Sequence, residues 1–238
     1  MTDAHIRIQQ ATQPYLFRNS VIMTHLPEED LGLLEKKALP KEGKRGEMLF
    51  KQGTYPNGVF WLVSGKAKIF QETPAGQRQT LYIYSDGDLI GYRQFISEEA
   101  HPVTAVLLED SIYRHIPGET FRGLLNTSTF FARNVLSALA REFTVWMNRM
   151  TVFTQFPVRH RLVLALLILQ EQYRMSGSPP GEITITRTEL AEYIGTSLET
   201  VVRALNTLKA AHLVGIHGRK ILLSDMTGLL DILHHEGM

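Results

Sequence analysis

The hydrophobic period of this sequence changes twice, and the changes limit the folds it can adopt. Between about residues 25 and 117, short apolar or alternating runs are separated by glycines. The runs are 47–50, 58–63, 67–71, 79–84, 103–108 and 111–116. Short runs at this spacing are typical of an antiparallel all-β domain. We therefore expect a β-roll of about eight strands over 25–117, preceded by an N-terminal extension over 1–24.

The second segment, 118–156, has the period of a long helix. Glycine and proline nearly disappear after Gly123, and large apolar residues recur at steps of three or four, which places them on one stripe. The stripe either packs on its own domain or pairs with the same helix of a second subunit, because its aromatic area is large for one neighbour to cover. The candidate dimer interface is Val135, Leu139, Phe143, Trp146 and Met150.

The third segment, 157–238, has the pattern of a winged helix-turn-helix. Thr186 and Glu189 form a capping box that starts a short helix, which stops at Gly195. A second, amphipathic helix opens at Thr196 or Ser197, and two short helices joined across a glycine are typical of DNA-binding modules. Residues 214–223 are predicted to form a hairpin with a basic tip, the wing. The predicted fold class is α+β, with a β-roll, a dimerisation helix and this module.

Composition narrows the classes of function. The formal net charge is +1, so nucleic-acid binding must come from a local arrangement of charge. The chain has no cysteine, which excludes cysteine-ligated iron–sulfur clusters and zinc sites built on thiolates. No signal-peptide stretch is found, and no apolar run approaches the roughly 18 residues of a membrane span. We expect a cytoplasmic protein.

Taken together, these segments resemble one family of bacterial regulators. The segments that carry the resemblance are the glycine-marked string 46–53, Gly65, Gly76, the run 87–91, and then 186–191 and 199–203 at the right distance. In this order and spacing they are similar to the cyclic-AMP receptor protein and fumarate-nitrate reductase regulator family. The resemblance covers residue 25 to the end and implies a homodimer on a twofold double-stranded DNA site.

The outward face of the second helix supports DNA reading. Arginine can donate two hydrogen bonds to guanine, and glutamate can accept one from cytosine. Glu199 and Arg203 match the family's base-reading pair, although an i, i+4 surface ion pair is the alternative interpretation. Leu198 stands where the cyclic-AMP receptor subgroup has arginine, which favours a thymine methyl and a TTGA-like half-site. The base-reading candidates are Leu198, Glu199, Val202 and Arg203.

Further candidates would contact DNA phosphates, which position a protein without selecting sequence. They are Arg187, Thr188, Ser197, Thr200, His217, Arg219 and Lys220. Each of them has solvated surface as its alternative interpretation.

The sensor segment departs from the family pattern. In members that bind cyclic nucleotides, a glutamate after the glycine pair and an arginine with serine or threonine hold the ligand. Here Tyr92 follows Gly91, and His101 and Pro102 occupy the arginine–serine position. A mostly neutral histidine cannot replace a bidentate arginine, which argues against cyclic AMP and cyclic GMP. Residues of this degenerate effector pocket are Gly91, Tyr92, Arg93, His101 and Thr104.

No other effector is indicated. Haem would need an axial ligand, for which His25, His101 and His115 are weak candidates. Arg93 could accept an anion, but the simpler interpretation is an exposed loop residue. No cofactor is predicted, and a regulator without a ligand is a further alternative.

Enzyme chemistry finds little support. The chain has no His-x-His pair for a cupin-type metal site, and His234 with His235 falls at the C-terminal end. Motifs for a serine nucleophile or a phosphate-binding loop are also missing from the sequence. We predict no catalytic residue and no metal ligand. The alternative to a transcription regulator is a β-roll that binds a small molecule or a protein partner. For a transcription regulator, RNA polymerase is a further candidate partner.

Overall fold

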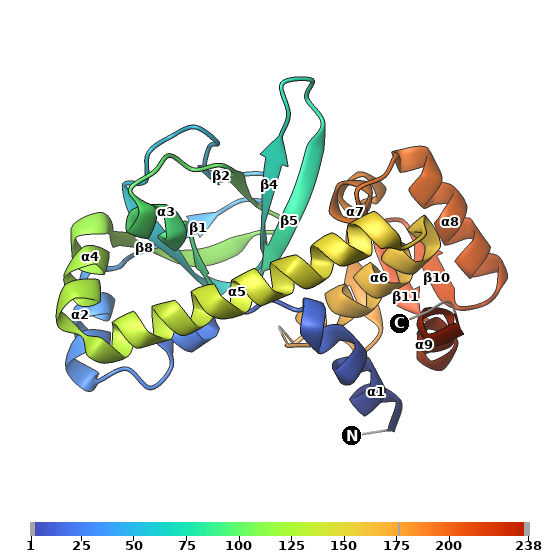
Figure 1. Ribbon diagram of the computed structural model, residues 1–238, viewed down its shortest axis with the longest axis horizontal. Helices are drawn as coiled ribbons and strands as arrows, with labels where there is room; N and C mark the ends of the chain where they lie inside the picture. The colour runs from blue at the N-terminus through green and yellow to red at the C-terminus, as the bar shows by residue number, and fades with distance from the viewer. Residues whose placement is uncertain (1–2, 176, 236–238) are drawn as a thin grey trace. The chain divides into compact units, whose positions relative to one another are not determined.

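The computed structural model describes residues 3–175 and 177–235, drawn in Figure 1. Its contacts divide the chain into two compact units. One is Phe17–Phe143, called here the sensor unit after its predicted role. The other combines Met1–Leu16 with Thr144–Met238 and is called the DNA-binding unit, likewise after its predicted role. The long helix α5, Thr129–Gln155, belongs to both units.

The sensor unit is built on two four-stranded antiparallel sheets. The strands are β1 (Leu39–Gly43), β2 (Met48–Phe50), β3 (Gly58–Ser64), β4 (Ala67–Glu72), β5 (Arg78–Tyr84), β6 (Leu89–Ile90), β7 (Thr104–Leu107) and β8 (Ser111–Pro117). One sheet has the order β1-β8-β3-β6 and the other β2-β7-β4-β5. The predicted β-roll is confirmed, and the β4–β5 hairpin projects from its sheet (Figure 1).

Helices close one end of the β-roll. They are η2 (Ser20–Met23), α2 (Glu28–Lys37), α3 (Tyr92–Ser97) and α4 (Gly118–Thr127). Their apolar faces share a core with the sheet and the first turns of α5, in which Leu34, Val59, Phe121 and Phe131 are fully buried. Ser128 separates α4 from α5, and its hydroxyl accepts a hydrogen bond from the Phe131 amide at 3.2 Å. This N-terminal cap starts α5 at Thr129.

The DNA-binding unit carries the predicted helix-turn-helix and wing. Its elements are α6 (Val158–Met175), β9 (Glu182–Thr184), α7 (Arg187–Ile194), α8 (Leu198–Ala210), β10 (Val214–His217), β11 (Lys220–Leu223) and α9 (Met226–His235). The strands form an antiparallel sheet in the order β10-β11-β9. His234 and His235 end α9 rather than a loose tail. No helix within the described residues has the length and apolar content of a membrane span.

The N-terminal extension is shared between the units. Helix α1 (Asp3–Thr12) and the short helix η1 (Gln13–Tyr15) belong to the DNA-binding unit, where α1 packs on α6 and α9. Ile8 is buried there, and Arg7 lies 3.5 Å from Asp231. Phe17, by contrast, is buried in the sensor unit, where its ring lies 5.0 Å from that of Tyr82. Residues 3–16 therefore belong to the DNA-binding unit.

Candidate nucleic-acid interface and effector pocket

Two caps hold the helix-turn-helix in place. The Thr186 hydroxyl accepts from the Glu189 amide at 3.1 Å, and the Glu189 carboxylate accepts from the Thr186 amide at 2.8 Å. This reciprocal pair is the predicted capping box, and it is confirmed. Helix α7 ends at Gly195, whose φ of 65° is the left-handed conformation that glycine adopts without strain. The chain then turns into α8.

Helix α8 separates an apolar face from a reading face. The Ser197 hydroxyl caps it by accepting from the Thr200 amide at 3.2 Å. Val201, Leu205 and Leu208 are buried beneath the helix. The opposite face, the reading face, is exposed and consists of Leu198, Glu199, Val202 and Arg203. The structure thus brings the four base-reading candidates together on one accessible surface.

Glu199 and Arg203 form a loose ion pair on this face. Their side chains are 81% and 71% exposed, and the charged atoms lie 3.8 Å apart. Pairs of this kind contribute about 0.3–0.5 kcal/mol. Because the pair is weak, either side chain can leave it for a base edge at little cost.

The seven phosphate-contact candidates occupy different environments. Thr188, Ser197, His217 and Arg219 are exposed, whereas Thr200 is partly buried and shares a hydrogen bond with the Ser197 hydroxyl. Arg187 donates to the Gly218 carbonyl at 3.0 Å, which holds the wing to the start of α7. Lys220 lies 2.6 Å from Glu182 on the neighbouring strand. Arg187 and Lys220 therefore have roles within the fold that the sequence did not reveal.

The effector pocket is nearly filled by its own side chains. It is lined by Phe50, Ile69, Tyr84, Gly91, Tyr92, Arg93, Gln94 and Val103 and encloses about 10 Å³. Such a void is at the lower limit for one water molecule. Gly91 has a φ of 87°, which strains any other residue, and a Cβ there would also lie 3.1 Å from the Phe50 ring.

Two further pocket candidates are tied to the sheet. His101 is buried, and its ring stacks on Phe50 with centroids 3.8 Å apart. Its Nδ1 finds no hydrogen-bond partner among the described residues, and burial lowers the pKa of the imidazole to about 4. The ring is therefore neutral at pH 7 and offers no positive charge to an anion. The Thr104 hydroxyl accepts from the Gln52 amide at 3.0 Å, so it serves the strand rather than the pocket.

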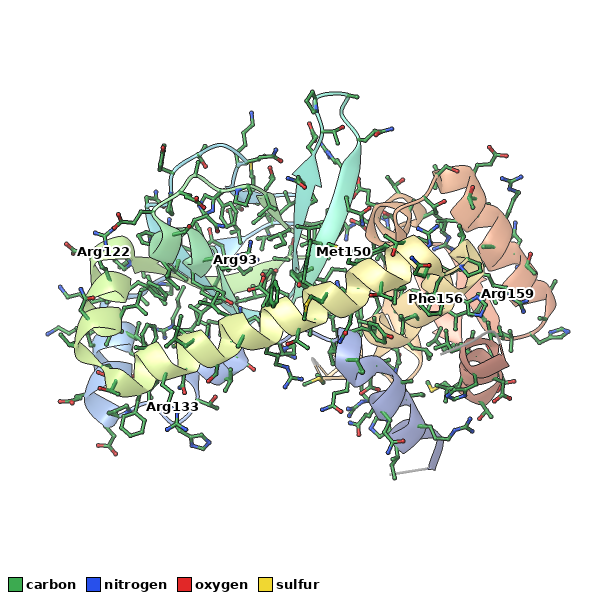
Figure 2. The ribbon with its side chains drawn as sticks, viewed as in Figure 1. Arg93, Arg122, Arg133, Met150, Phe156 and Arg159 are labelled. Atoms are coloured by element: carbon green, nitrogen blue, oxygen red, sulfur yellow. The ribbon has the colours of Figure 1, made fainter. Side chains whose placement is uncertain are left out.

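Arg93 has a partner that the sequence did not predict. Its guanidinium donates to the Glu142 carboxylate on α5 at 2.7 Å, and the Tyr92 hydroxyl donates to the other carboxylate oxygen at 3.0 Å. Figure 2 shows Arg93 beside α5. The interpretation of Arg93 as an exposed loop residue is therefore wrong, because α3 turns the side chain toward the helix.

The predicted stripe on α5 divides between two faces of the helix. The inward face is Val135, Ala138, Glu142, Val145, Arg149 and Val152, all of them buried. The exposed face, called here the seam, is Leu136, Ala140, Phe143, Met147, Met150 and Thr154. Val135 is only 1% exposed within its own chain, so its assignment to a dimer interface is corrected. Leu139 packs partly against the same core, and Phe143, Trp146 and Met150 remain exposed.

Known proteins match both halves of the chain. The model of the cyclic nucleotide-binding domain matches residues 40–128, and the model of the Crp-like helix-turn-helix domain matches residues 160–232. The anaerobic regulatory protein of Haemophilus influenzae is 24% identical over 202 residues, which are 84% of this chain and 77% of that protein. The transcriptional activator protein anr of Pseudomonas aeruginosa is 27% identical over 205 residues, 84% and 83% of the two chains.

Solved structures share the fold. FixK2 of Bradyrhizobium japonicum matches with a TM-score of 0.73 at 21% identity, over 82% of this chain and 96% of that one. The c-di-GMP-responsive regulator CLP of Xanthomonas campestris gives 0.71 at 20% identity, over 83% and 99%. The β-roll and the helix-turn-helix are thus matched in the order seen here. This chain belongs to the cyclic-AMP receptor protein and fumarate-nitrate reductase regulator family of DNA-binding transcription regulators.

Proposed function

We propose that this regulator binds a palindromic DNA site with TTGA-like arms through the reading face of α8, as a homodimer. The observation that carries the proposal is the exposure of Glu199 and Arg203 beside two apolar side chains on one capped helix. Arg203 donates to guanine O6 and N7, and Glu199 accepts from a cytosine amino group. Leu198 and Val202 contact thymine methyls, a chemistry open to apolar side chains in the major groove.

The seam on α5 supports dimerisation. Its residues follow one another at alternating steps of four and three from Leu136 to Thr154, which is the a/d repeat of a coiled coil. Leu136 and Phe143 are 66% and 61% exposed, large values for apolar side chains. Pairing two copies of the seam buries this surface and would space two α8 helices for grooves about 34 Å apart.

A variant of the seam tests the dimer. Leu136→Asp places two like charges across the paired helices, and we expect sedimentation to show a monomer and DNA affinity to fall. Arg141→Asp, also exposed on α5 but off the seam, is the matched control and should stay dimeric. A dimer that survives Leu136→Asp would contradict the proposed seam.

No ligand is required in this proposal. Cyclic AMP and cyclic GMP find neither space nor their usual polar partners in a pocket that Tyr92 and Phe50 fill, with His101 stacked on Phe50. His101 is a poor haem ligand here because its ring lies flat against Phe50. The Xanthomonas regulator is described as responding to c-di-GMP. For this chain we propose no cofactor and no catalytic activity. We propose that it is located in the cytoplasm and acts on RNA polymerase from its DNA site.

Selection of bound duplexes from a random pool, with purified protein and no added ligand, tests the proposal. We expect a twofold motif with TTGA-like arms. Arg203→Ala should abolish enrichment, whereas Lys51→Ala, which removes one exposed positive charge from the sensor unit, should leave it intact. Equal enrichment by both variants would show that α8 does not read the bases. No enrichment by the wild-type dimer would contradict ligand-free binding.

A further inference from the structure

We infer that Glu142 is a built-in counter-ion that fastens α5 to the effector pocket of the β-roll, in place of a bound ligand. The inference rests on the proposed function and extends it, since it explains how the regulator would keep its DNA-binding state without an effector. The group of Glu142, Tyr92 and Arg93 is called here the latch.

The latch joins segments far apart in the sequence. The Glu142 carboxylate receives the Arg93 guanidinium at 2.7 Å and the Tyr92 hydroxyl at 3.0 Å. The Glu142 backbone carbonyl accepts from the Tyr82 hydroxyl at 3.3 Å, so β5 also contacts this turn of α5. Three donors from two parts of the β-roll therefore converge on one residue of the helix.

Burial makes these bonds costly to break. The Glu142 side chain is 4% exposed and that of Arg93 is 39% exposed. Burial raises the pKa of Glu142, while Arg93 and Tyr92 oppose that rise. Tyr84 is also buried nearby, and its pKa is raised by burial and by Glu142. A buried carboxylate that loses its cation is left uncompensated in a site of low polarity.

The latch also occupies two of the polar side chains that line the effector pocket. Tyr92 and Arg93 line the effector pocket, and both already bind Glu142. The helix thus supplies the negative charge from inside the protein. An interaction shifts a conformational equilibrium only when it is stronger in one state than in the other. The latch is part of the protein itself, so it favours one position of α5 without a ligand.

Charge-neutral variants test the latch. Glu142→Gln keeps the side-chain size, Arg93→Gln shortens the side chain, and each removes one charge. We expect each to weaken DNA binding without ligand by about tenfold or more, within the usual range of coupling between sites. The double variant should be no weaker than the weaker single variant, because both remove the same interaction. Tyr92→Phe removes one hydroxyl and should give a smaller loss, which keeps the test usable if Glu142→Gln folds poorly.

Glu72→Gln is the matched control. Glu72 pairs with Arg78 on the exposed hairpin of the same unit, at 2.5 Å, and its loss should leave DNA affinity within about twofold. Wild-type affinity in Glu142→Gln, or losses that add in the double variant, would overturn the latch.

Hydrogen exchange separates the latch from the proposed function. If the wild-type protein selects no DNA, the proposed function fails, but the latch still predicts faster amide exchange over residues 138–143 in Glu142→Gln. Unchanged exchange there would overturn the latch whatever the DNA result. Exchange in the Glu72→Gln control should equal that of the wild-type protein.

Discussion

Two glutamate–arginine pairs, one in each unit, show how environment divides the roles of the same residue types. On α8, Glu199 and Arg203 are mostly exposed and 3.8 Å apart. In the sensor unit, Glu142 is almost fully buried and lies 2.7 Å from Arg93. The exposed pair is weak and can exchange its partner for a base, whereas the buried pair is fixed by the cost of leaving a charge alone. An accessible pair suits recognition, and an inaccessible one suits attachment.

The largest effect is expected where the exposed pair meets DNA. Arg203→Gln should lower affinity for the selected duplex by about 2–6 kcal/mol, since each half-site contact contributes about 1–3 kcal/mol. Its free energy of unfolding should stay within about 0.5 kcal/mol of the wild-type value. Fluorescence anisotropy and urea denaturation measure the two quantities. An unstable Arg203→Gln protein would show that this pair also supports the fold.

His101 is another buried titratable residue of the sensor unit, and its pKa gives a pH-dependent prediction. Its folded-state pKa of about 4 lies below the ordinary value of about 6.5, so the unfolded chain binds the proton more strongly. Stability from this residue is complete above pH 6.5 and falls as the pH approaches 4, by up to about 3 kcal/mol.

Urea denaturation at several pH values, compared with His101→Phe, isolates this contribution. The variant keeps a ring against Phe50 and cannot titrate. Burial and Lys41 lower the pKa of His115 as well, but that contribution is present in both proteins and cancels in the difference. Parallel pH profiles for the two proteins would contradict the assignment to His101.

How much the sequence could predict differs between the same two regions. Local signals defined the helix-turn-helix: Thr186, Glu189 and Gly195 act within one turn of a helix end. Glu142 and Tyr92 are 50 residues apart, and no local pattern connects them. The available signal was spacing. Glu142 lies four residues after Ala138 and three before Val145, which places its carboxylate on the same stripe of the helix as these apolar residues.

The predicted stripe on α5 combined residues from two faces of the helix, and the reason is geometric. Two successive steps of four residues lead from Val135 to Phe143. At 100° per residue, Phe143 is rotated by about 80° around the helix axis from Val135. Val135 therefore faces the core while Phe143 faces outward. Spacing alone could not decide which positions the β-roll covers, because that depends on the contacts of another domain.

A stability measurement on the buried pair sharpens the contrast further. Arg93→Gln should reduce the free energy of unfolding by about 2 kcal/mol, less than the 3–5 kcal/mol for a fully buried pair because the guanidinium is partly exposed. The same change at Arg203 should have almost no effect on stability. Urea denaturation of both variants under one set of conditions tests this, and equal losses would remove the distinction between the pairs.

The smallest expected effect concerns the cap that presents the exposed pair. Ser197→Ala removes the hydroxyl that accepts from the Thr200 amide, and loss of such a cap costs about 1 kcal/mol. The first turn of α8 carries Leu198 and Glu199, so fraying there should also weaken DNA binding slightly. Ser197→Asp restores an acceptor and should recover stability, but its charge would repel a nearby phosphate. Recovery of stability without recovery of affinity would place Ser197 at the DNA backbone, whereas recovery of both would leave it a cap alone.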